Sequence, residues 1–195
     1  MSDVKYTYAV ARIRALEVSL FSASAIEQLI ACKNYDACLD FLKEKGWGDA
    51  EQDKTAESIL TTEEERIWQV MAELSVDRSN FEILFYTNWF HNLKAAIKNV
   101  CTKDKVQNIY YKSSFMPPEE LEQLVREQDF GSLPENMQDA AKDAFETLLH
   151  SRDGQLCDCI IDQACLKAIR KSGKASHTEV IRTYAVTTVA LADIK

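Results

Sequence analysis

Apolar side chains recur every three to four positions along most of the chain, a spacing typical of amphipathic α helices. The first such stretch covers residues 3–22, and its apolar positions are Ala9, Ile13, Leu16 and Leu20. The same spacing predicts further helices at residues 24–32, 34–46, 61–74, 79–100, from 117 onward, 134–148, 155–171 and 176–195. The pattern therefore predicts an all-α fold of about nine helices with no sheet.

Polar residues mark the ends of several of these helices. Thr61 and Thr62 each precede a glutamate by three positions, a spacing that lets the two side chains cap a first helical turn. Ser79 precedes a glutamate in the same way, so we expect helices to begin at these residues. Asn34 is expected to cap the third helix, and Gly46 to close it in a left-handed conformation.

The stretch FYTNWFHNLKAAIKN, residues 85–99, is rich in aromatic and polar groups and raises the question of a reaction site. Its apolar residues share one arc of a helix: Phe85, Tyr86, Trp89, Phe90, Leu93, Ala96, Ile97 and, just beyond it, Val100. Asn92 and Lys94 fall on opposite borders of that arc, and His91 points nearly away from it. They cannot converge on one substrate atom, so we interpret the stretch as a core helix and expect it to pack against the N-terminal helix.

Composition and charge narrow the class of protein. The chain of 195 residues holds only five Gly and three Pro, which favours helices over turns. The net charge of −8 disfavours nucleic acid as a partner, although residues 166–195 are basic and could touch acidic lipid headgroups. No apolar run is long enough to span a bilayer, and the start lacks a secretion signal. We therefore expect a cytoplasmic protein that is held at a membrane only through partners.

Chemical motifs are scarce. RKSGKASH lacks the glycine spacing of a phosphate loop, and Cys157, Cys159 and Cys165 form no zinc-binding spacing with the histidines. The six cysteines are expected to be free thiols, mostly buried in helices. We therefore assign no catalytic, cofactor-binding or metal-binding residue and expect no cofactor. A cysteine–histidine nucleophile pair stays open as an alternative, since such groups could meet in space.

Two segments resemble each other within the chain. The helix predicted after Ser79 contains the triplet Asn92-Leu93-Lys94, and the helix after Ser176 closes on the similar triplet Asp193-Ile194-Lys195. This echo indicates an internal repeat. We accordingly expect one helical lobe over residues 1–110 and a second, incomplete lobe over 111–195.

Four segments resemble the C subunit of the archaeal and bacterial V/A-type ATP synthases, which is kin to the d subunit of the eukaryotic V-ATPase. They are YTYAVARIRALEVSLFS, FHNLKAAIKN, LPENMQDAAKDAF and IDQACLKAI. The resemblance implies an elongated, all-α funnel of repeated lobes that sits on the membrane proteolipid ring and holds the foot of the central shaft. It also implies a rotor coupling role with no catalytic site.

The chain departs from that family in two respects. Its last residues coincide with the end of the second repeat, so that it covers somewhat more than half of a typical member and lacks the C-terminal lobe. Trp89 and Ala190 stand where the motif commonly has Asp. The chain is either a truncated form or a short natural paralogue. A free-standing helical adaptor that binds another protein is the alternative function.

The C-terminal helix carries an apolar stripe that the missing lobe would cover. Its positions are Val180, Ile181, Tyr184, Thr188 and Leu191. If the cover is absent, residues 176–195 should associate with a second copy of the chain. If the chain is complete, the stripe should instead fold back onto residues 134–171.

Overall fold

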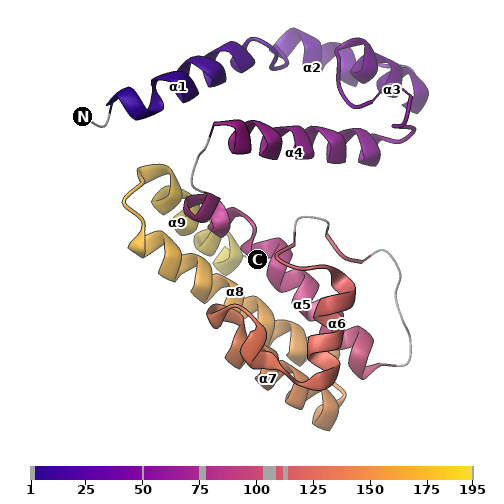
Figure 1. The fold of residues 1–195 in the computed structure, drawn as a ribbon. Coiled ribbons are helices and arrows are strands. Elements are labelled where there is room, and N and C mark those ends of the chain that lie inside the picture. Colours follow the sequence, from indigo (N-terminus) through magenta and orange to yellow (C-terminus); the bar gives the residue numbers. More distant parts are fainter. Residues whose placement is uncertain (1–2, 50, 75–77, 103–108, 112–113, 195) are drawn as a thin grey trace. The chain divides into compact units, whose positions relative to one another are not determined.

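The computed structural model describes residues 3–49, 51–74, 78–102, 109–111 and 114–194. Over these residues it contains nine α helices, two 3₁₀ helices and no strand, so the all-α prediction is confirmed (Figure 1). The α helices are α1 (Asp3–Glu17), α2 (Ala23–Ile30), α3 (Tyr35–Glu44), α4 (Ala56–Glu73), α5 (Tyr86–Cys101), α6 (Pro118–Glu127), α7 (Glu135–Ser151), α8 (Gly154–Ala175) and α9 (Glu179–Ile194). The 3₁₀ helices are η1 (Arg78–Leu84) and η2 (Phe130–Ser132).

The chain divides into two compact units, residues 1–77 and 78–195, which we call unit 1 and unit 2. This division describes compactness, whereas the predicted lobes of residues 1–110 and 111–195 describe sequence repetition. The lobe boundary therefore stays a prediction.

Several predicted helix ends are confirmed. The Asn34 side chain accepts a hydrogen bond from the Ala37 N–H at 2.9 Å and so caps α3. Gly46 follows the end of that helix with a left-handed φ of 82°. Pro118 opens α6 within its first turn, where the missing proline N–H removes no helical hydrogen bond.

Two predicted helix starts are wrong. α4 begins at Ala56, ahead of the two threonines, because Thr55 and Ser58 already form a capping box there. In this box a serine hydroxyl replaces the usual glutamate. The segment after Ser79 forms η1, and the Phe85 N–H bonds to the Glu82 carbonyl at 2.9 Å. α5 therefore starts later. Phe85 is its N-cap residue, and no side chain forms a capping hydrogen bond there.

Unit 1 has a small core. Leu39, Leu42 and Ile59 are buried, and Phe21 and Trp47 pack around them with ring centroids 4.8 Å apart. None of residues 6–20 is buried. Most of the described surface of α1 is therefore uncovered within its own unit.

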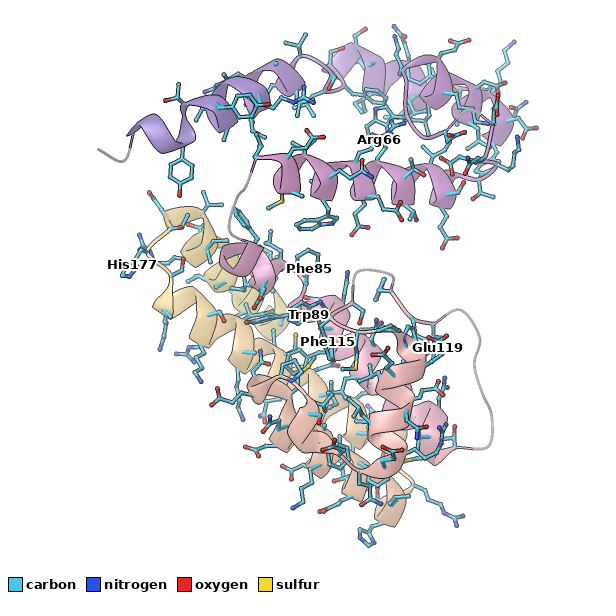
Figure 2. All side chains as sticks on the ribbon, viewed as in Figure 1. Arg66, Phe85, Trp89, Phe115, Glu119 and His177 are labelled. Atoms are coloured by element: carbon cyan, nitrogen blue, oxygen red, sulfur yellow. The ribbon has the colours of Figure 1, made fainter. Side chains whose placement is uncertain are left out.

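One arginine fixes the loop between α3 and α4. The Arg66 guanidinium donates hydrogen bonds to the carbonyls of Gly46 at 3.0 Å and Gly48 at 2.9 Å, and it pairs with Glu63 (Figure 2). Glu63 in turn accepts the Gly48 N–H at 2.7 Å. Gly48 has a φ of 68°, and a Cβ there would lie 2.9 Å from Ile59. Only glycine suits this position without strain.

Unit 2 is built around α5. This helix packs against α6, α7 and α8, and α9 packs against α8. The predicted apolar face is confirmed: Phe85, Tyr86, Phe90, Leu93, Ala96 and Ile97 are buried, and Trp89 and Val100 are partly buried. Trp89 stacks on Phe85 and meets the edge of Phe115, with centroid distances of 6.1 Å and 5.4 Å (Figure 2). The predicted partner is wrong, because helices of unit 2 itself cover this face.

The contact between α8 and α9 is unusually close. A Cβ placed on Gly173 would lie 2.2 Å from the Cβ of Ala185. The two helices approach this closely because neither residue carries a bulky side chain. Ile181 on α9 is buried beside them.

Candidate functional site

Polar side chains of α5 form hydrogen bonds with the backbone of residues 109–111. The Asn92 side chain accepts the Tyr111 N–H and donates to the Tyr111 carbonyl, each at 2.9 Å. His91 donates through Nε2 to the Ile109 carbonyl at 2.9 Å. Asn92, predicted at one border of the apolar arc, is only 1% exposed, so this border is buried as well. It faces residues 109–111, whose backbone groups it satisfies.

A second cluster of polar side chains surrounds Asn99, further along α5. The Tyr110 hydroxyl donates to Glu122 at 2.7 Å, and Asn99 donates to both side chains at 3.3 Å and 3.1 Å. Burial, together with the adjacent Glu122 carboxylate, raises the pKa of Tyr110 far above its ordinary value. The phenol therefore stays protonated and serves as a structural donor.

Two lysines of α5 pair with two aspartates of α8. Lys94 lies 2.8 Å from Asp162, and Lys98 lies 2.6 Å from Asp158. We call these four residues the Lys–Asp ladder. Both lysines are committed to helix–helix contacts, and Lys94 is the only member of the predicted Asn-Leu-Lys triplet that reaches the edge of the core.

The cysteines of α8 follow the predicted pattern. Cys157 and Cys165 are buried, whereas Cys159 is exposed on another side of the helix. Burial raises the pKa of Cys157 to about 11 and that of Cys165 to about 12. Burial also raises the pKa of Cys101. These thiols are protonated at neutral pH, so no observation favours a thiol enzyme built on them.

The described residues contain no group of three or more His, Cys, Asp or Glu side chains that could hold a metal ion. A shallow groove of about 340 Å³ runs between α7 and α8. α7 contributes Glu135, Asp139 and Asp143 to its lining, and α8 contributes Lys167 and Lys171. Its charged groups stand on separate walls, which suits surface contact better than a reaction on one bound atom.

Exposed apolar side chains form the most distinctive surface feature. On α1 and the residues after it they are Tyr6, Tyr8, Val10, Ile13, Val18 and Leu20; on α4 they are Leu60 and Ile67. Where such residues form a contiguous patch, they mark sites of protein–protein contact. The predicted inward position of Ile13 and Leu20 is wrong. The available signal was the distribution of apolar residues such as Tyr8 on more than one side of α1.

α9 has one covered and one uncovered apolar side. Ile181 is buried against the core, and Tyr184 and Thr188 are partly buried. Val180 and Leu191 are 73% and 57% exposed. The stripe is therefore divided: Ile181 packs onto α8, which overlaps the residues 134–171 expected for a stripe that folds back, whereas Val180 and Leu191 are uncovered.

No helix among the described residues is both long and apolar enough to cross a bilayer. Comparison with protein families places residues 9–195 within a model described as ATP synthase (C/AC39) subunit. The chain belongs to this family. Both units lie almost wholly within the matched range, and the family is that of a non-catalytic subunit of the V/A-type ATPases.

One curated relative of this C/AC39 subunit is the C subunit of the V-type sodium ATPase of Enterococcus hirae. The two proteins are 26% identical over 165 residues, which are 83% of this chain and 50% of the relative. The chain thus spans about half the length of the curated relative it matches. No solved structure gives a significant match to the chain.

Proposed function

We propose that this chain is a non-catalytic rotor coupling subunit that links the central shaft of a V/A-type ATPase or ATP synthase to its membrane proteolipid ring. The observation that carries the proposal is the family match over residues 9–195. In this role the chain works in the cytoplasm and is peripheral to the membrane through its partner subunits. The complex would translocate protons or sodium ions, and this chain would take no part in the chemistry.

The internal packing of unit 2 supports this role. The polar side chains of α5 are bound to neighbouring segments, and the Lys–Asp ladder joins two of its longest helices. A part that transmits torque must resist deformation, and close-packed interiors have low compressibility. The polar side chains of α5 would therefore help to keep unit 2 rigid.

The exposed surface supports the role in a second way. Tyr8 is 67% exposed and Val10 is 57% exposed on α1, so this helix offers apolar area that its own unit does not bury. Burial of such area is the main driving force of protein association. A subunit that lies between partner subunits can bury this apolar area against them.

Co-purification tests the proposal. The affinity-tagged chain, expressed with the remaining subunits of its complex, should retain both shaft subunits and proteolipid ring in mild detergent. Tyr8→Glu should reduce this recovery about tenfold, because a charge is added to an apolar contact. Leu149→Glu is the matched control, since Leu149 is a similarly exposed apolar residue on α7. Retention of neither shaft nor ring would contradict the coupling role and favour the free-standing adaptor.

We further propose that residues 176–195 can associate with a second copy of the chain. Val180, Val186 and Leu191 on α9 are all more than half exposed. In a symmetric pair, each copy would bury this side of the helix against the other.

A further inference from the structure

Two thiols lie on either side of the turn between α2 and α3. Cys32 follows the end of α2, and Cys38 lies near the start of α3. The Cys32 Sγ is 3.7 Å from the Ala37 carbonyl oxygen, to which it donates, and the Cys38 Sγ donates to the Leu29 carbonyl at 3.8 Å. Each sulfur thus reaches a backbone carbonyl of the other helix, and for Cys32 that carbonyl belongs to the residue directly before Cys38.

The other described cysteines have different surroundings. Cys101 and Cys157 also lie near each other, but Cys157 is fully buried in the core of unit 2. Cys165 is buried, and Cys159 is exposed on α8. Cys32 and Cys38 are both partly exposed. They combine proximity of the two side chains across one turn with access from solvent, which thiol–disulfide exchange requires.

We propose that Cys32 and Cys38 form a dithiol modification site that closes to a disulfide by exchange with a small disulfide such as oxidised glutathione. One cysteine thiolate attacks a glutathione sulfur, which forms a mixed disulfide and releases one glutathione thiolate. The second cysteine thiolate then attacks the protein sulfur of that mixed disulfide and releases the second glutathione. Two electrons pass from the two protein thiols to the glutathione disulfide, and the two thiol protons are taken up by the released glutathiones.

Disulfide formation requires both side chains to rotate. The two sulfur atoms must close to about 2.05 Å, so each must turn from the carbonyl that it contacts toward the other sulfur. Partial burial and the neighbouring Cys38 thiol raise the pKa of Cys32. Exchange should therefore be slow at neutral pH and accelerate as pH rises, because the thiolate is the attacking species.

The disulfide would fasten α2 to α3. Among the described residues of unit 1, the core contains three buried apolar residues, so a covalent link across this hairpin has a larger relative effect there than in unit 2. Disulfides stabilise mainly by restricting the unfolded chain. Oxidation should raise the temperature at which unit 1 unfolds and leave unit 2 unchanged.

Peptide mapping of the full chain tests the proposal. The chain is incubated with oxidised glutathione, its free thiols are alkylated, and it is digested with trypsin, which can cleave after Lys33 between the two cysteines. The linked pair of peptides containing Cys32 and Cys38 should exceed every other cysteine link by about tenfold. Reduction should restore both free thiols.

Variants identify the sulfur atoms involved. Cys32→Ser and Cys38→Ser should each abolish the link and leave a glutathione adduct on the remaining cysteine, while Cys159→Ser should leave the link unchanged. Separate glutathione adducts on Cys32 and Cys38 in the unsubstituted chain would overturn the proposal. A dominant link between Cys101 and Cys157 would also overturn it.

Discussion

Unit 1 and unit 2 are both built from helices, yet they bury apolar residues very differently. In unit 2 a single cluster of buried residues includes side chains from η1 and from each helix from α5 through α9. In the described part of unit 1 the buried cluster consists of Leu39, Leu42 and Ile59. Helical periodicity is present in both, so the pattern that forms a helix does not determine how much of it is covered.

The difference shows what each unit can do alone. Unit 2 buries its own core and pairs the polar side chains of α5 with its own segments, so it resembles a self-sufficient domain. Unit 1 leaves α1 and part of α4 uncovered, and we expect its helices to gain stability from a partner. Single substitutions can test this contrast, from the largest expected effect on stability to the smallest.

Leu93→Ala should lower the free energy of unfolding of unit 2 by about 2–5 kcal/mol, because Leu93 is fully buried on α5. Urea unfolding would be followed through Trp89 fluorescence, with Trp47 and Trp68 of unit 1 replaced by phenylalanine. Leu60→Ala is the control in unit 1, since Leu60 is 55% exposed and should change stability by less than about 0.5 kcal/mol. A loss below about 0.5 kcal/mol for Leu93→Ala would show that its face is not buried.

Gly173→Ala should destabilise unit 2 by about 1–3 kcal/mol, because the new Cβ meets that of Ala185 and α8 and α9 must move apart. Gly154→Ala is a matched control in the same helix, where the nearest atoms to an added Cβ lie 3.8 Å and 3.9 Å away on a lysine side chain. Thermal unfolding measured by circular dichroism would compare the two. Equal melting temperatures would contradict the close approach of the helices.

Asn92→Leu should cost about 1–2 kcal/mol in the unfolding free energy, because both hydrogen bonds to the Tyr111 backbone are lost. The Tyr111 amide should also exchange its hydrogen faster. Asn88→Leu on the same helix is the control, because Asn88 is only partly buried. Unchanged amide exchange at Tyr111 in Asn92→Leu would rule out the bond between these residues.

Leu191→Glu should change the unfolding free energy by less than about 0.5 kcal/mol, since Leu191 is exposed. It should nevertheless abolish concentration-dependent association in sedimentation velocity, because a carboxylate would be buried between copies. Leu149→Glu on α7 is the control and should associate like the unsubstituted chain. A chain that stays monomeric at every concentration, and that Leu191→Glu strongly destabilises, would refute the proposed pair.

Helix content was the most predictable feature of the sequence. Helical periodicity depends on local spacing, and the capping of α3 by Asn34 depends on residues three positions apart. The wrong start of α4 has a local cause too, because Thr55 and Ser58 bond to each other as a threonine and a glutamate would. Such alternatives are close in energy, which limits how well a boundary can be predicted.

Long-range contacts were less predictable. The apolar face of α5 was evident from spacing, but that spacing is equally compatible with any apolar partner, and the N-terminal helix was the wrong one. The burial of Asn92 had no local signal, because its partner Tyr111 approaches from a separate segment. The exposed apolar residues of α1 lie on more than one side of the helix, which indicates a surface but does not identify the partner that would cover it.

The Lys–Asp ladder also bears on mechanical load. Lys94 and Lys98 are four residues apart on α5, as are Asp158 and Asp162 on α8, and the two pairs run in opposite chain directions. If force slid one helix along the other by one turn, about 5.4 Å, one new lysine–aspartate pair could form while one lysine and one aspartate lost their partners. Sliding would thus proceed in discrete steps with a barrier at each. Under shear, the contact would resist sliding until the force is large enough to break an ion pair.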